Sequence, residues 1–177
     1  MADKDERTTI SRRDLLRGSF LKRRFEKDSG CPRGDLDPTL VTQAEEALDR
    51  NDFGKAAEVF GTVLRAGPDS PSLRRKYAYA LYRHGKIIQA RVEFVRVIRK
   101  GEDPLARLFL GLCQARTGQL HRTSCTWKEF TCPALPDLTA AVQERLSGYG
   151  EKEELSPETI AAIEELAFCN VSALLQS

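Results

Sequence analysis

The sequence predicts an all-α fold, a right-handed solenoid of helix–turn–helix repeats with closing helices at its C-terminal end. The main observation is that residues 51–60 and 85–94 align without a gap, 34 residues apart. A period of this length is typical of stacked pairs of antiparallel helices, in which small residues let the two helices approach closely. Small or apolar residues recur at the matched positions, which pair Ala44 with Ala78, Phe53 with Ile87, Ala56 with Ala90, Phe60 with Phe94, Val63 with Val97 and Leu64 with Ile98.

The composition agrees with this fold class. Hydrophobic residues make up 41% of the 177 residues and charged residues 31%, as expected for a soluble helical protein. No window approaches 18 consecutive apolar residues, so we expect no transmembrane helix.

Two repeats are clear in the sequence. The first spans 37–70, and Pro38 stands where its first helix begins. The second spans 71–103, with Gly85 at the turn between its helices.

A third, degenerate repeat spans 104–135 with a shift of one residue. Gly111 takes the small position, Gly118 takes the turn, and Trp127 stands where the earlier repeats have phenylalanine. Because Trp127 is larger than its counterparts, we expect it to fill the core of this repeat and not to stack on a ligand.

The segment 136–177 is expected to close the solenoid with helices at 136–147 and 157–175. Ser156 and Pro157 provide the N-cap and first position of the last helix. We expect that helix to lie over the exposed edge of the third repeat, which has no further neighbour. Glu164 and Glu165 are expected on its solvated face.

The repeat pattern over 37–135 resembles the tetratricopeptide repeat family, most specifically in the first two repeats. This resemblance implies that the first helices of the repeats line a concave groove that receives peptides or helices of other proteins. Carried onto this sequence, the groove residues are Glu45, Leu48, Asp49, Arg75, Tyr79, Tyr82, Arg83, Leu108, Leu112 and Arg116.

Aromatic rings flanked by arginines suit a partner segment that carries carboxylates and an apolar anchor. The sequence therefore favours a non-enzymatic adaptor or scaffold whose partner is a peptide or helix of acidic character. The alternative for Tyr79 and Tyr82 is that both rings only pack between helices.

The segment 1–36 is a basic arm. Ser11-Arg12-Arg13-Asp14-Leu15-Leu16-Arg17 resembles a twin-arginine export signal, but a basic amphipathic stretch follows where an export signal needs an apolar one. We therefore expect a cytoplasmic protein. If the arm reflects an accessory role at a membrane redox enzyme, the protein would lie at the periphery of that membrane complex. Three interpretations of the arm remain open: a solvated helix or tail, a helix that lies on a membrane surface, or a segment that docks on a partner protein. The docking residues would be Arg12, Arg13, Leu15, Leu16 and Phe20.

Charge is distributed unevenly along the chain. Residues 7–27 carry a net charge of +6, residues 74–128 carry +10, and residues 133–177 carry −6. Opposite charges at the two ends suggest weak self-association, and the basic middle suggests a second class of function, nucleic-acid association. The candidate phosphate contacts are Arg74, Arg75, Lys76, Arg83, Lys86, Arg91, Arg96, Arg99 and Lys100.

No pattern in the sequence predicts catalysis, a cofactor or a metal site. The five cysteines are odd in number and irregularly spaced, which favours free thiols over a disulfide framework. His121, Cys125 and Cys132 lack the paired spacing of structural zinc ligands.

Overall fold

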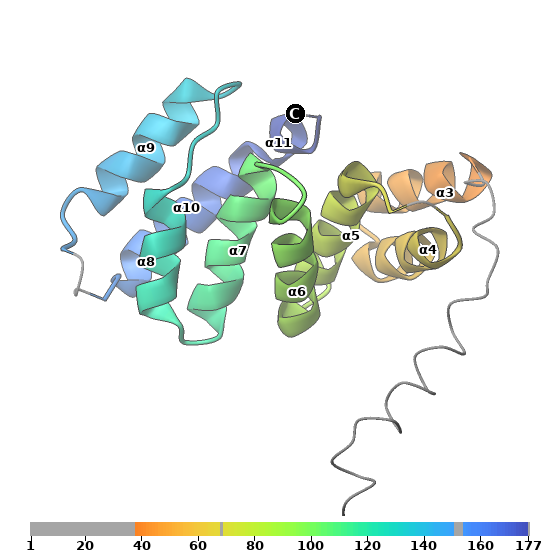
Figure 1. Ribbon diagram of the computed structural model, residues 1–177, viewed down its shortest axis with the longest axis horizontal. Coiled ribbons are helices and arrows are strands. Elements are labelled where there is room, and N and C mark those ends of the chain that lie inside the picture. The colour runs from red at the N-terminus through yellow and green to blue at the C-terminus, as the bar shows by residue number, and fades with distance from the viewer. Residues whose placement is uncertain (1–37, 68, 151–153, 177) are drawn as a thin grey trace, which may run out of the picture. The chain divides into compact units, whose positions relative to one another are not determined.

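The computed structural model describes residues 38–67, 69–150 and 154–176, and within them it contains α-helices and no strand (Figure 1). The predicted all-α fold class is confirmed. The helices are α3 (Pro38–Asp49), α4 (Phe53–Ala66), α5 (Pro71–Arg83), α6 (Ile87–Ile98), α7 (Pro104–Arg116), α8 (Leu120–Lys128), α9 (Pro136–Leu146), α10 (Pro157–Cys169) and α11 (Val171–Gln176). None of the described helices has the length and apolar character needed to cross a membrane.

The first six of these helices form three hairpins, which pair α3 with α4, α5 with α6 and α7 with α8 (Figure 1). Four alanines at the predicted contact positions, Ala44, Ala56, Ala78 and Ala90, are fully buried. Because these side chains are small, the backbones of the paired helices lie close together. The buried rings of Phe60 and Phe94 fill the next layer of the core. The repeat pattern read from the sequence therefore corresponds to the core.

The turn inside each hairpin has a residue in the left-handed region. These residues are Asn51 (φ 60°), Gly85 (φ 83°) and Gly118 (φ 73°). Asparagine and glycine tolerate this conformation better than other residues do. The spacings of 34 and then 33 residues match the one-residue shift expected for the third repeat.

Trp127 fills the core of the third repeat, as predicted. Its side chain is fully buried, and its indole Nε1 donates a hydrogen bond of 2.9 Å to the Leu108 carbonyl. The ring lies directly against Gly111, where an added Cβ would be 2.1 Å from Nε1. Trp127 can therefore occupy this position only because residue 111 is glycine.

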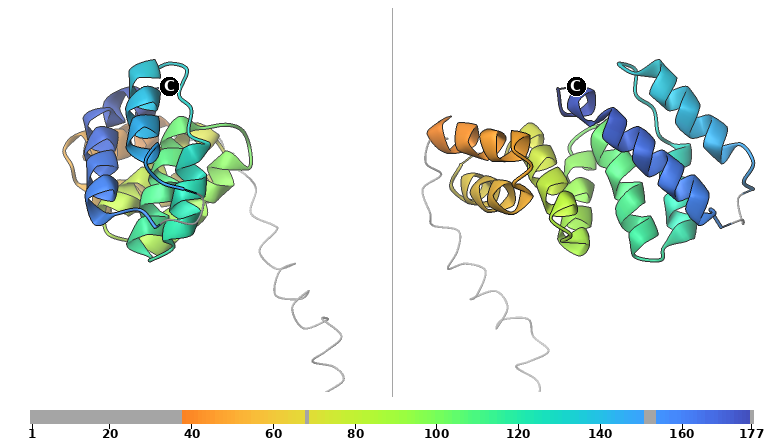
Figure 2. Two further views of the ribbon diagram at one scale, coloured as in Figure 1. Left: turned by 90° about the vertical axis from the view of Figure 1, so that its left-hand side faces the viewer. Right: turned by 180° about the vertical axis from the view of Figure 1, so that it is seen from behind.

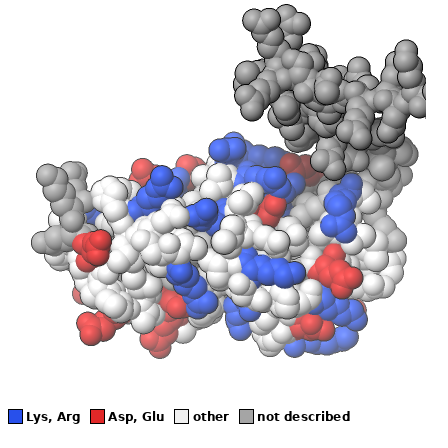
Figure 3. Space-filling view, turned by 90° about the horizontal axis from the view of Figure 1, so that it is seen from below, with Lys and Arg blue, Asp and Glu red and all other residues white. Residues whose placement is uncertain are grey.

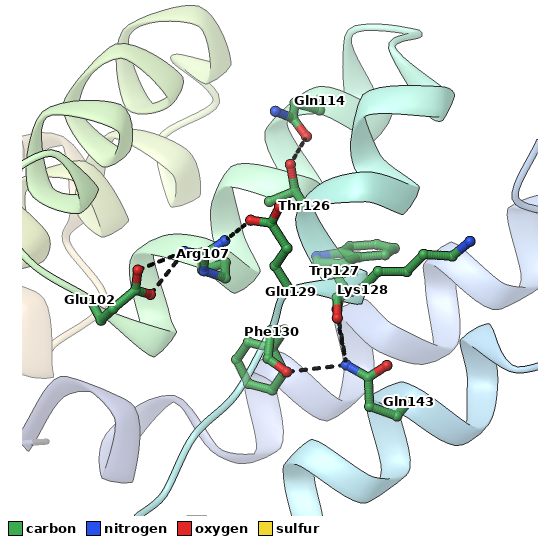
Figure 4. Close-up of polar contacts among 9 residues, drawn as sticks. All are labelled: Glu102, Arg107, Gln114, Thr126, Trp127, Lys128, Glu129, Phe130 and Gln143. Atoms are coloured by element: carbon green, nitrogen blue, oxygen red, sulfur yellow. Dashed lines mark hydrogen bonds and ion pairs between the residues drawn. The ribbon is translucent and has the colours of Figure 1, made fainter. Parts of the chain in front are cut away.

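Polar contacts join the third repeat to its neighbours (Figure 4). Arg107 of α7 forms ion pairs with Glu102, before the helix, and with Glu129, after α8. On α9, Gln143 donates from its amide nitrogen to the carbonyls of Trp127 at 3.2 Å and Phe130 at 3.1 Å. Because carbonyls at the end of α8 have no partner within that helix, Gln143 fixes α9 against it.

The last segment forms two helices and not the single one expected. Asn170 separates α10 from α11, while Ser156 caps α10 by accepting a hydrogen bond from the Thr159 amide at 3.2 Å. The last helix packs on the third repeat as expected, but not at its outer edge: α9 packs against α8, and α10 lies across α7 and against α9 (Figure 2). The reason is that the Glu164 side chain of α10 and the Leu175 carbonyl of α11 find complementary partners on α5 and α7.

Asp69, in the connection between α4 and α5, links two helices of the second repeat. Its carboxylate pairs with Lys100, just after α6, and with Arg74 of α5 at 2.6 Å. The hydrogen bond from Lys100, opposed by partial desolvation and assisted by Arg74, holds the pKa of Asp69 below its ordinary value of 3.8.

The Asp69→Asn variant is expected to lose about 0.5 kcal/mol of stability at pH 7, a small value because the side chain is 43% exposed. A lowered native pKa means that this contribution is present above pH 3.8 and is lost as the pH falls through the native value. Urea unfolding at pH 7 and at pH 3 would measure it. An equal difference between variant and wild type at both pH values would contradict the prediction.

Candidate functional site

The first helices of the three repeats, α3, α5 and α7, form one surface, which we call the inner groove. Phe109 of α7 lies at the centre of its aromatic cluster. Its ring contacts Tyr79 and Tyr82 of α5 edge to face, with centroids 5.3 and 5.2 Å away, and Phe168 of α10 at 5.9 Å. Two repeats and a closing helix therefore share one aromatic core.

Helix α10 meets this surface through one carboxylate and one ring. The Tyr82 hydroxyl donates a hydrogen bond of 2.8 Å to Glu164, and Arg116 of α7 pairs with the same carboxylate at 2.5 Å. The Arg83 guanidinium lies 4.9 Å from the centroid of the Phe168 ring, within range of a cation–π contact. The groove of the second and third repeats thus holds an acidic residue and an aromatic anchor from its own chain.

Burial affects the chemistry of both tyrosines. Loss of solvent raises the pKa of Tyr82, and the hydrogen bond to Glu164 raises it further. Burial also raises the pKa of Tyr79, against the opposing effect of Arg83, which donates to its hydroxyl at 2.8 Å. Both phenols therefore remain protonated, and Tyr82 remains a donor to Glu164 at neutral pH.

Helix α11 is held by Arg75 of α5. The guanidinium donates to the carbonyl of Leu175 at 3.0 Å and pairs with Asp103 at 3.2 Å. Asp103 also accepts a hydrogen bond from the Ala106 amide at 2.8 Å and so caps α7. Arg75 therefore connects α5, the start of α7 and α11.

A cleft of about 400 Å³ remains at the end of the inner groove, between α3, α5 and α11. We call it the open cleft. It combines apolar side chains with the carboxylates of Glu45 and Asp49, and Lys76 forms an ion pair of 2.5 Å with Glu45 inside it. Its lining residues are Glu45, Leu48, Asp49, Asn51, Phe53, Lys76, Tyr79, Val171, Ser172 and Leu175.

The structure divides the groove residues named from the sequence into three groups. Arg75, Tyr79, Tyr82, Leu108 and Leu112 are buried. Arg83 and Arg116 are exposed but contact residues of α10. Glu45, Leu48 and Asp49 line the open cleft. The arm residues Arg12, Arg13, Leu15, Leu16 and Phe20 lie outside the described residues.

Sequence reasoning missed Glu164 and Phe168. The expectation that Glu164 and Glu165 share a solvated face was wrong for Glu164, whose side chain is only 22% exposed, and held for the exposed Glu165. A useful signal was present, because Glu164 and Phe168 stand four residues apart and so share a side of the helix. They match the carboxylate and apolar anchor predicted for an external partner.

The described residues contain no group of three or more histidine, cysteine, aspartate or glutamate side chains arranged to hold a metal ion. Cys113 and Cys132 are buried, whereas Cys125 and Cys169 are exposed, and all four carry free thiols. Burial raises the pKa of Cys113 to about 12, which keeps its thiol in the weakly nucleophilic protonated form.

A family model described as tetratricopeptide repeat matches residues 41–100, which include the first two hairpins except for the first residues of α3. No curated protein and no solved structure was found to match the chain.

Proposed function

Because residues 41–100 belong to the tetratricopeptide repeat family, whose repeats form protein-interaction modules, we propose that this protein is a non-enzymatic, cytoplasmic adaptor. A peptide or helix of a partner protein binds in the open cleft of the inner groove. The observation that carries this proposal is the unfilled volume of about 400 Å³ beside a groove that otherwise holds α10 and α11.

The residues of the cleft support a partner with both apolar and polar character. Leu48, Phe53 and Val171 provide apolar contact area. Asp49 has no ion-pair partner among the described residues and is exposed, whereas Lys76 is already paired with Glu45. An apolar anchor with a neighbouring basic group would suit this end of the groove, while acidic anchors suit the end that α10 occupies.

Nucleic-acid binding, the second class of function considered from the sequence, receives less support. Arg74, Arg75, Lys76, Arg96 and Lys100 all form ion pairs with carboxylates of the described chain. Figure 3 shows acidic side chains among the basic ones on the face that it presents. Internal pairing lowers the positive potential that a phosphate backbone would meet.

The proposal is tested by affinity capture from a lysate of the source cells, with Leu48→Glu and Ser172→Trp as bait variants. Leu48→Glu places a charge in the open cleft, and Ser172→Trp fills it from the exposed side of α11. Proteins bound by the wild type are expected to be depleted about tenfold by each variant, as for loss of a central contact.

The matched control is Thr62→Glu, which introduces the same side chain as Leu48→Glu at an exposed position of α4 that does not line the open cleft. It is expected to retain the partner. Circular dichroism of all baits establishes that each is folded. Equal capture by the wild type and both cleft variants would refute the proposal.

A further inference from the structure

A second cleft, of about 460 Å³, lies on the second helices of the repeats, between α6 and α8 and over α7. We call it the outer groove. None of its lining residues lines the open cleft. Its lining includes Arg91, Val92 and Arg96 of α6, Arg99 directly after α6, Leu110 of α7 and Arg122 of α8.

Four guanidinium groups give the outer groove an excess of positive charge. Arg96 pairs with Glu93 at 2.7 Å, but Glu93 also pairs with Arg74 and is buried. Among the described residues, no carboxylate lies within ion-pair distance of Arg91, Arg99 or Arg122. The surface therefore differs from the part of the basic middle of the chain where Arg74, Arg75, Lys76 and Lys100 are paired with carboxylates.

An apolar strip runs beside these arginines. Val92 is 43% exposed and Ile88, one turn earlier on α6, is 66% exposed; they are the exposed large hydrophobic residues of the described chain. Residues four apart share one side of a helix, and the half-buried Val95 adds apolar surface inside the groove, over the buried Leu110. Exposed aliphatic area at a cleft is typical of a surface that a partner covers.

We propose that the outer groove binds an acidic peptide segment of another protein, independently of the open cleft. Carboxylates of the segment pair with Arg91, Arg99 and Arg122, since the planar guanidinium group matches a carboxylate through two parallel hydrogen bonds. An aliphatic or aromatic side chain of the segment packs on Val92. Charge complementarity and the adjoining apolar strip together define this occupant.

The lining of the groove distinguishes a peptide from a nucleic acid. Single-stranded nucleic acids are bound by basic grooves with aromatic rings on which bases stack, and no aromatic residue lines this groove. Its apolar residues are aliphatic, which suits a leucine-like anchor. Because the groove has arginines but no aromatic ring, a peptide that carries carboxylates matches it better than a single-stranded nucleic acid does.

The test is a selection from a displayed library of random twelve-residue peptides on the immobilised full-length protein. Enriched peptides are expected to combine several aspartate or glutamate residues with an apolar residue. The binding of synthetic copies of the enriched peptides is then measured by fluorescence anisotropy for the wild type, an Arg91→Glu/Arg99→Glu variant and a Val92→Glu variant. We expect each variant to weaken binding at least about tenfold, as for loss of paired charges or of an anchor contact.

The Leu48→Glu variant separates this inference from the proposed function, because it alters the open cleft and leaves the outer groove intact. Acidic peptides should bind it as they bind the wild type. An oligo(dT) strand measured alongside is expected to bind more weakly than the selected peptides. Absence of acidic enrichment, undiminished binding by the α6 variants, or tighter binding of the DNA would overturn the inference.

Discussion

Replacing Gly111 with alanine is expected to lower the free energy of unfolding by about 3 kcal/mol, the upper range for overpacking a core with one methyl group. The added Cβ would lie 2.1 Å from Nε1 of Trp127, which is fully buried and hydrogen-bonded to Leu108. The ring has no solvent-facing position into which it can move. Thermal unfolding followed by circular dichroism should show a melting temperature lower by roughly 6–12 °C.

Two further variants make this prediction specific. Gly101→Ala is the matched control, because a Cβ there meets no atom within 4 Å and Gly101 has no left-handed φ; it should change stability by less than about 0.5 kcal/mol. Gly111→Ala combined with Trp127→Phe should cost less than the sum of the two single changes, since the smaller ring relieves the clash. A Gly111→Ala protein that melts like the wild type would contradict this packing of the tryptophan on the glycine.

The hairpins were predictable because local residues determine them. Ala56 and Ala90 mark the close contacts, and Asn51 and Gly85 mark turns that need a left-handed residue. These signals operate within one repeat and recur in the next, so spacing alone located them. The position of Trp127 followed by the same reasoning, since it occupies the place of a core phenylalanine.

The position of α10 was not predictable in this way. Ile163 and Ala167 stand four residues apart, as apolar residues on one side of a helix do, and both are fully buried. Such a pattern states which side of a helix is covered but not which surface covers it. Contacts between Glu164 and Tyr82 join residues 82 positions apart, and no local signal in the sequence specifies that pairing.

The same limit applies to the groove. Helical spacing placed Tyr79 and Tyr82 on one helix together with Arg83, and both rings meet Phe109 of the neighbouring repeat. The chemistry expected of a partner, a carboxylate with an apolar anchor, is provided by Glu164 and Phe168. What the sequence left undetermined was whether that partner segment belongs to another protein or to this chain.

Replacing both Glu164 and Phe168 with alanine is expected to release α10 from the inner groove. The change removes the acceptor of the buried Tyr82 hydroxyl, the ion pair with Arg116 and the ring that contacts Phe109. Leaving a buried donor unpaired costs about 1–3 kcal/mol, and removing a half-buried phenylalanine costs about 2 kcal/mol by its lost apolar area. Together these losses are large for one short helix.

Hydrogen–deuterium exchange read by mass spectrometry measures the release. Peptides from α10 and α11 should exchange at least about tenfold faster in the variant, because each 1.4 kcal/mol lost from local stability raises the open population tenfold. Peptides from α4 and α6 should be unchanged, since their contacts lie within the hairpin stack. Glu165→Ala, at the exposed neighbouring position, is the control and should exchange like the wild type.

A synthetic peptide of residues 157–176 shows whether α10 occupies a binding surface or only covers an edge. If Glu164 and Phe168 act as an internal ligand, the double variant should bind the wild-type peptide in trans, while the intact protein binds it at least about tenfold more weakly because the tethered copy competes. A peptide carrying the same two alanines should bind neither protein. Unchanged exchange in the double variant, or no binding of the wild-type peptide to it, would mean that α10 is a fixed part of the core and that the open cleft is the accessible part of the inner groove.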